Sequence, residues 1–159
     1  MIHAVPTSDV RPVPVNDPEV IEAAVQILNE NNAIQIATLG GPWTPWILGA
    51  YFTATADRGL EIHLMVEKHG KTMQNLRADN RVAFTVNSGD ATQDFLQGAG
   101  TAEVRDDAEA DALVAALQVK MPWYRLYTPC APVRIRVSNA FVTSFKRGWL
   151  PAKTLAFGN

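Results

Sequence analysis

The chain has 159 residues, of which 47% are hydrophobic and 19% charged, a composition typical of one globular domain with its own core. The formal net charge of −2 gives no bulk attraction to nucleic acid or to an anionic membrane, so we expect neither as a partner. The only cysteine, Cys130, excludes an internal disulfide and a cysteine-rich zinc site, and it fits a location in the reducing cytoplasm.

The N-terminal part predicts an extended arm followed by a helix. Residues 1–17, MIHAVPTSDVRPVPVND, contain three prolines between positions 6 and 14, which favours an extended arm. Asp17 and Pro18 then supply an N-cap carboxylate and a proline at the first helical position. The next apolar residues recur at helical spacing and predict a helix that ends near residues 29–32: Val20, Ala24, Ile27 and Leu28.

From residue 33 onward apolar and polar residues alternate, which is typical of strands. Short helices are predicted at residues 71–79 and 106–121, where good helix formers replace this alternation. The predicted strands cover residues 33–39, 44–55, 60–67, 81–87, 94–105 and 133–147, the last as one bent strand or a tight pair.

The connections between these strands predict the architecture. They are mostly short turns, such as the one at residues 40–42, and only antiparallel neighbours permit such turns. A sheet of this size must hide its edges, and closure into a small barrel is the usual solution. Gly98 and Gly100 allow a bulge or a close approach of another backbone. We therefore predict that residues 18–159 form one mainly β domain, a six- to seven-stranded antiparallel barrel with flanking helices.

Several frequent catalytic and cofactor motifs are absent from the sequence. No G-x-G-x-x-G opens a helix after a strand, no G-x-x-x-x-G-K-[ST] phosphate loop occurs, and neither H-E-x-x-H nor G-x-S-x-G is present. The histidines at positions 3, 63 and 69 are too scattered to predict a metal site. A dinucleotide-binding, zinc-protease or serine-hydrolase function is therefore not indicated.

Basic residues gather where the strand at 60–67 passes into the helix at 71–79. Lys71 follows Gly70 and opens the helix, and the unpaired backbone N–H groups of a helix N-terminus favour anions. His69 and Thr72 add hydrogen-bond donors, so this segment has the chemistry that holds a terminal phosphate. On charge alone, a solvated surface helix is the better interpretation of these basic residues: Lys68, Lys71 and Arg77.

The residues around Lys71 favour the phosphate site over the solvated surface helix. The segment KTMQNLRADNRVAF resembles the pattern K-x-x-N-L-R-x-D-x-R-V-A of the pyridoxamine 5′-phosphate oxidase-like superfamily of flavin-binding split barrels, with one extra residue between the lysine and the asparagine. The matching residues are Lys71, Asn75, Leu76, Arg77, Asp79, Arg81, Val82 and Ala83. IQIATLGGPWTPWILGAYF is similar to the family's first hairpin, and GAGTAEV to its glycine-alanine strand, so the resemblance spans roughly residues 18–147. Taken without the resemblance, Leu76 is predicted to lie in the core, and Asn75 to cap or brace the loop.

The resemblance implies a split β-barrel of Greek-key topology in a homodimer, with FMN in a cleft between the two subunits. It implies that Lys71 contacts the FMN phosphate, together with its neighbours Gly70 and Thr72 and with His69, which stands where family members often carry arginine or serine. The residues implied to lie along the ribityl chain and the flavin ring are Met65, Val66, Glu67, Trp46, Ile47, Leu48 and, at the ring edge, Gln97.

The resemblance further implies an FMN-dependent oxidoreductase with a small-molecule substrate that the sequence does not identify. True pyridoxamine phosphate oxidases end in a motif of arginines and a histidine, which this chain lacks, so vitamin B6 synthesis is not indicated. The aromatic loop at residues 122–132 is interpreted first as packing, and secondly as a cover for a flat ring or a contact for the partner subunit.

Two alternative functions stay open from the sequence. One is a deazaflavin-dependent reductase, whose acidic cofactor tail would need basic groups such as Lys68, Lys146, Arg147 and Lys153. The other is a non-catalytic barrel that binds flavin or heme, with His63 or His69 as an axial ligand. On an alternating strand, however, His63 is more readily a structural histidine.

Overall fold

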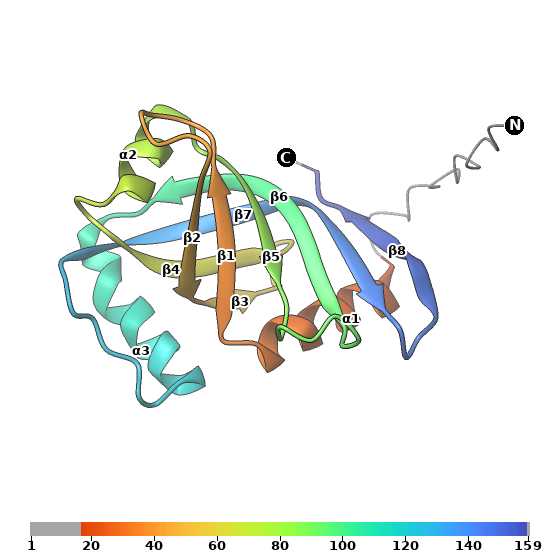
Figure 1. Ribbon diagram of the computed structural model, residues 1–159. Helices are drawn as coiled ribbons and strands as arrows, with labels where there is room; N and C mark the ends of the chain where they lie inside the picture. Colours follow the sequence, from red (N-terminus) through yellow and green to blue (C-terminus); the bar gives the residue numbers. More distant parts are fainter. Residues whose placement is uncertain (1–16, 159) are drawn as a thin grey trace, which may run out of the picture.

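Within residues 17–158, which the computed structural model describes, eight antiparallel strands form one curled sheet with three α-helices around it (Figure 1). The helices are α1 (Pro18–Glu30), α2 (Lys71–Ala78) and α3 (Ala110–Lys120), with a 3-10 turn η1 (Asp107–Glu109) before α3. The strands are β1 (Ala33–Thr38), β2 (Trp46–Tyr51), β3 (Thr53–Thr55), β4 (Glu61–Glu67), β5 (Arg81–Val86), β6 (Phe95–Val104), β7 (Cys130–Ser144) and β8 (Trp149–Ala156). The predicted N-terminal arm, residues 1–17, lies outside the described residues except for Asp17.

The sheet curls because the chain joins its two ends. The strand order is β2-β1-β5-β6-β7-β4-β3, with β8 paired to β7, so β2 and β3 stand at opposite ends although only Phe52 separates them. Phe52 is fully buried, and its N–H donates to the carbonyl of Asn32 at 3.1 Å. The predicted mainly β, antiparallel split-barrel architecture is confirmed. The single strand predicted at residues 44–55 is wrong, because the chain changes strand partners at Phe52.

The C-terminal part contains more sheet than predicted. Residues 130–144 form one strand rather than a pair, and it begins three residues earlier than the predicted start at 133. β8 is absent from the predicted elements and raises the number of strands in the described part to eight. It includes Pro151, which an edge strand tolerates because one of its sides makes no ladder hydrogen bonds, and β8 pairs with β7 alone.

The predicted irregularity at the glycines of β6 is confirmed. The register between β6 and β7 shifts between Ala99 and Gly100. A Cβ on Gly100 would collide with the carbonyl oxygen of Arg136, and a Cβ on Gly98 would lie 2.6 Å from the Phe84 ring. Glycine is therefore required where β6 bends around the curled sheet.

The core lies between α1 and the inner face of the sheet. Asp17 caps α1 as predicted, since its carboxylate accepts hydrogen bonds from the N–H groups of Glu19 at 3.0 Å and Val20 at 3.4 Å. The apolar face of α1 is buried against inward-facing strand residues, and its members are Val20, Ala23, Ala24, Ile27 and Leu28. None of the helices between residues 17 and 158 has the length and apolarity to cross a membrane.

α3 packs on the other side of β4 and is tied to the rest of the molecule by Lys120. A second buried cluster joins Met65 of β4 to Leu117, Met121 and Tyr124. The ammonium of Lys120 donates hydrogen bonds to three carbonyl oxygens at 2.5–3.1 Å, those of Leu28, Asn31 and Phe52. These bonds link α3 to the end of α1 and to the junction of β2 and β3.

Candidate cofactor site at the start of α2

A pocket of about 430 Å³ lies where β4 ends and α2 begins, and we call it the α2 pocket. Its walls come from the end of β4, the first turn of α2, strand β2 and the loop before β2. The lining residues are Trp43, Trp46, Leu48, Val66, Glu67, His69, Gly70, Lys71, Thr72 and Gln74. Eight of the eleven residues predicted for cofactor binding are therefore gathered around one cavity.

Lys71 carries the free positive charge of this pocket. Its ammonium lies 4.7 Å from the ring centre of Trp43 and 5.1 Å from that of Trp46. The faces of indole rings attract a cation without neutralising it. Lys71 takes part in none of the ion pairs found between residues 17 and 158, whereas its neighbour Lys68 pairs with Asp107 at 2.8 Å. The Lys71 charge is thus available to an anionic ligand.

The N-terminus of α2 adds backbone donors beside Lys71. Gly70 is the N-cap residue, and no side chain caps the helix. The N–H groups of a first helical turn have no partner within the helix, and the helix dipole makes this end favourable for an anion. Glu67 opposes this, because its carboxylate also lines the pocket close to Gly70. The local field therefore favours a ligand phosphate only where that phosphate lies nearer to Lys71 than to Glu67.

The aromatic wall of the pocket is held in place by hydrogen bonds. The indole N–H of Trp46 donates to the hydroxyl oxygen of Thr72 at 3.1 Å, and this hydroxyl keeps its own proton for an acceptor. The buried amide of Asn75 donates to the hydroxyl of Thr38 at 3.0 Å and to the carbonyl of Trp43 at 2.9 Å. Asn75 therefore braces the loop that carries Trp43, as predicted from the residues alone.

The same loop approaches α2 closely. Gly41 has a φ of +72°, and a Cβ at this position would lie 2.6 Å from the side-chain oxygen of Asn75. Gly40 is packed against the backbone of α2 in the same way. Leu76 on the inner side of α2 is buried in the core, which confirms its predicted place. The loop, α2 and the core thus form one packed unit behind the pocket.

Three of the predicted site residues do not line the α2 pocket. Met65 is buried under α3. Ile47 is 68% exposed on the opposite face of β2 from Trp46 and Leu48, since successive side chains of a strand point to opposite faces. Gln97 is exposed on β6, between Thr85 of β5 and Phe141 of β7.

Trp43 and Gln74 line the pocket but are absent from the predicted site. The signal for Trp43 is the turn Gly40-Gly41-Pro42, which returns the chain toward the start of α2 just before this aromatic residue. Gln74 lies one helical turn after Gly70, and positions at this spacing share a face of a helix.

The other basic residues considered from the sequence lie elsewhere. Arg147 and Lys146 pair with Asp94 at 2.9 and 3.6 Å, and the ammonium of Lys153 lies over the ring of Trp149. None of these residues lines the α2 pocket, so the basic groups that a deazaflavin tail would need are not gathered there. Arg77 is exposed on α2 and does not line the pocket either.

The two described histidines occupy different environments. His69 is exposed at the α2 pocket. His63 is half-buried on β4, where its Nε2 is 2.9 Å from the hydroxyl of Thr55, and burial lowers its pKa below the ordinary value. Among residues 17–158, no three side chains of histidine, cysteine, aspartate or glutamate are grouped as metal ligands.

Neither a protein-family model nor a curated protein matches the chain. Solved structures do match it. A heme-binding protein from Mycobacterium smegmatis is 20% identical with a TM-score of 0.68, over 87% of this chain and 58% of that one. Campylobacter jejuni ChuZ is 14% identical with a TM-score of 0.69, over 89% and 61% of the two chains.

A FAD-binding protein from Mesorhizobium loti, mll6688, is 18% identical with a TM-score of 0.58, over 76% of this chain and 90% of that one. At these identities the similarity shows the fold alone. The fold is thus one that a heme-binding protein and a FAD-binding protein also have, and the chain's own residues must decide what it binds.

Proposed function

We propose that the protein binds FMN in the α2 pocket and works as a flavin-dependent oxidoreductase on a small organic molecule. The observation that carries this proposal is the unpaired ammonium of Lys71 at the uncapped N-terminus of α2, next to an aromatic wall. A terminal phosphate needs this combination of a positive charge and free N–H donors.

The residues present fit the two ends of such a ligand. Lys71, Thr72 and the first-turn N–H groups offer donors for a phosphate, while Trp43, Trp46 and Leu48 offer apolar surface for a flat ring. The volume of about 430 Å³ lies in the usual range for a small-molecule site. A bound flavin would supply hydride or electron transfer, and the protein's part is to hold it and to keep water from one face.

A second copy of the chain is the proposed partner. The outer faces of β2, β1, β5 and β6 place a row of small and apolar residues side by side across four strands: Ile47, Ala37, Ala83 and Ala99. Ile47 and Tyr51 on this face are 68% and 46% exposed, and apolar surface of this kind favours association. A homodimer through this face would bury it.

The decisive experiment is identification of the cofactor. Denaturation releases the bound ligand from the purified protein, and the ligand is identified by mass spectrometry and absorbance. Apoprotein is then titrated with FMN, and the mass of the complex is measured by light scattering. A saturable flavin spectrum in a dimer supports the proposal, while apoprotein that takes up no FMN contradicts it.

Heme is the second candidate, since His69 is exposed at the same pocket and a heme-binding protein has the same fold. Heme would give a Soret band that disappears in His69→Ala and persists in Lys71→Ala. FMN binding would instead be weakened more by Lys71→Ala than by His69→Ala. Uptake of a deazaflavin in place of FMN by the same apoprotein would support the deazaflavin alternative.

A further inference from the structure

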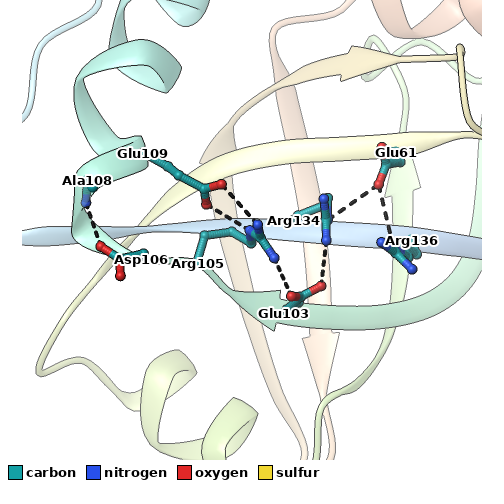
Figure 2. Close-up of polar contacts among 8 residues, drawn as sticks. All are labelled: Glu61, Glu103, Arg105, Asp106, Ala108, Glu109, Arg134 and Arg136. Atoms are coloured by element: carbon teal, nitrogen blue, oxygen red, sulfur yellow. Dashed lines mark hydrogen bonds and ion pairs between the residues drawn. The ribbon is translucent and has the colours of Figure 1, made fainter.

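A chain of alternating charges crosses the outer surface of β6, β7 and β4 (Figure 2). It consists, in order, of Glu109, Arg105, Glu103, Arg134, Glu61 and Arg136. The strand register explains part of this order. On β7, Arg134 lies opposite Glu103 of β6, and Arg136 lies opposite Glu61 of β4. Side chains on one face of adjacent strands are direct neighbours.

The two ends of this chain differ in how well the charges are paired. Arg105 hydrogen-bonds both carboxylate oxygens of Glu109, at 2.7 and 2.9 Å, and also contacts Glu103. At the other end, Glu61 lies 3.4 Å from Arg134 and 3.6 Å from Arg136, which is longer than a good hydrogen bond. The first end is saturated, and the second holds two guanidinium groups around one loosely placed carboxylate.

The loosely paired end opens into a cavity of about 620 Å³. We call it the arginine pocket, and its lining residues are Arg58, Gly59, Leu60, Glu61, Thr101, Arg134, Arg136, Val137, Phe157 and Gly158. Three guanidinium groups and one carboxylate thus line the cavity. Arg134 is also paired with Glu103, whereas Arg58 joins none of the ion pairs found among residues 17–158. The cavity has a local excess of positive charge in a protein of net charge −2.

The donors of this cavity are also incompletely satisfied. The Nε of Arg134 is buried and has no hydrogen-bond partner, although its Nη2 donates to Glu103 at 2.7 Å. Arg136 is 67% exposed, so its fork of donors is free to turn toward a ligand. Guanidinium groups bind phosphate and carboxylate groups through paired hydrogen bonds.

Part of the cavity lining is apolar and anchored. It is formed by Leu60, Val137 and Phe157. The N–H of Val137 donates to the carbonyl of Leu60 at 3.0 Å, and the N–H of Phe157 donates to the carbonyl of Ser138 at 2.8 Å. Phe157 also lies against Gly59, in the turn that carries Arg58. An aromatic surface is thus fixed beside the cationic one.

We propose that the arginine pocket is a second binding site, separate from the α2 pocket, for a small organic anion. The phosphate or carboxylate of this ligand lies between Arg58 and Arg136, and its apolar part rests on Phe157. Glu61 and Glu67 stand at opposite ends of β4, so the two pockets are about 20 Å apart along the strand. One small molecule does not reach both pockets of a single chain.

The test is an NMR titration of the ¹⁵N-labelled full-length chain, with Lys71→Ala as the background so that the α2 pocket does not compete for phosphate. The probes are phenyl phosphate, benzoate and inorganic phosphate, and the reporters are the backbone amides of Gly59 and Thr101. We expect saturable shifts, with one of the two aromatic anions binding more tightly than inorganic phosphate. Which one binds more tightly identifies the anionic group that the site prefers.

The variants make the assignment specific. Replacing both Arg58 and Arg136 by glutamine should weaken binding about tenfold or more, which corresponds to the loss of a charge-assisted contact. Glu61→Gln should tighten binding several-fold, since it removes the competing carboxylate. The control Arg77→Gln, an exposed arginine outside the pocket, should leave the affinity unchanged. The proposal is overturned by shifts that do not saturate near about 10 mM, or by equal affinity in the double variant and the control.

Discussion

The α2 pocket and the arginine pocket lie at opposite ends of β4 and hold positive charge in different ways. In the first, one lysine stands over two indole rings with no carboxylate paired to it in the described part of the chain. In the second, guanidinium groups share a glutamate at 3.4–3.6 Å. A lone ammonium suits a ligand that supplies the full counter-charge, whereas a shared carboxylate means that a ligand must compete with the protein's own anion.

The largest expected effect is at the lone charge. Lys71→Ala should weaken FMN binding about 10- to 100-fold, because a hydrogen bond to a charged group contributes about 1.5–3 kcal/mol. The measurement is a fluorescence titration of apoprotein with FMN. Lys68→Ala is the matched control, because Lys68 is three residues away and already paired with Asp107. Equal losses in both variants would show that general charge, and not the position of Lys71, holds the ligand.

The brace behind the α2 pocket should have the next largest effect. Asn75→Ala leaves the carbonyl of Trp43 and the hydroxyl of Thr38 without their donor, which should lower the free energy of unfolding by about 1–3 kcal/mol. FMN affinity should fall as well, because the loop with Trp43 loses its anchor. Urea unfolding measures the first effect. The neighbouring exposed position, in Gln74→Ala, should change stability by less than about 0.5 kcal/mol.

The two pockets also differ in how far the sequence predicts them. Seven of the ten residues that line the α2 pocket come from one continuous segment, Val66 to Gln74, and Trp46 and Leu48 follow from the resemblance of the strand at 44–55. Trp43 lies outside that segment and was not predicted, although it completes the aromatic wall. The arginine pocket combines the β3–β4 turn with β4, β6, β7 and the C-terminal residues, and its parts meet only through the strand register.

The fold shows the same division between local and distant information. The helices, most strands and the glycine bulge of β6 follow from patterns within a few residues, and they are confirmed. The break at Phe52 depends on strand pairing at both ends of the sheet, which no local pattern contains. β8 was missed because its proline and mixed residues hide the alternation. The role of Asn75 was predictable because an asparagine inside a helix usually uses its side chain to hydrogen-bond a neighbouring backbone group.

At the shared carboxylate we expect a smaller effect. Glu61→Gln leaves Arg134 and Arg136 without their common anion, and stability should fall by about 1 kcal/mol, because the carboxylate is mostly buried but its contacts with the two arginines are long. Added phenyl phosphate should raise the melting temperature of this variant more than that of the wild type, because the ligand replaces the missing charge. Thermal unfolding with and without the ligand measures both. An identical ligand-induced shift in the two proteins would count against a ligand between the arginines.

The smallest effect concerns His63, two residues from Glu61 on β4. Burial lowers its pKa below the ordinary value of 6.5, Arg134 acts in the same direction, and Glu61 opposes them. As pH falls through 6.5, the unfolded chain binds a proton at this position that the folded chain does not yet bind, so unfolding becomes more favourable. The contribution of His63 to stability is therefore complete above pH 6.5 and is lost as the pH falls toward its lowered pKa.

An NMR titration of the His63 ring gives its pKa directly, and urea unfolding over the same pH range gives the slope of stability with pH. His63→Gln should reduce that slope, and Glu61→Gln should lower the pKa of His63 further, because it removes the group that raises it. A lower His63 pKa in Glu61→Gln would show that His63 senses the charge of Glu61, the carboxylate of the arginine pocket. A His63 pKa above 6.5 would mean that the carboxylate outweighs burial, and that the positive excess in this pocket is smaller than its three guanidinium groups suggest.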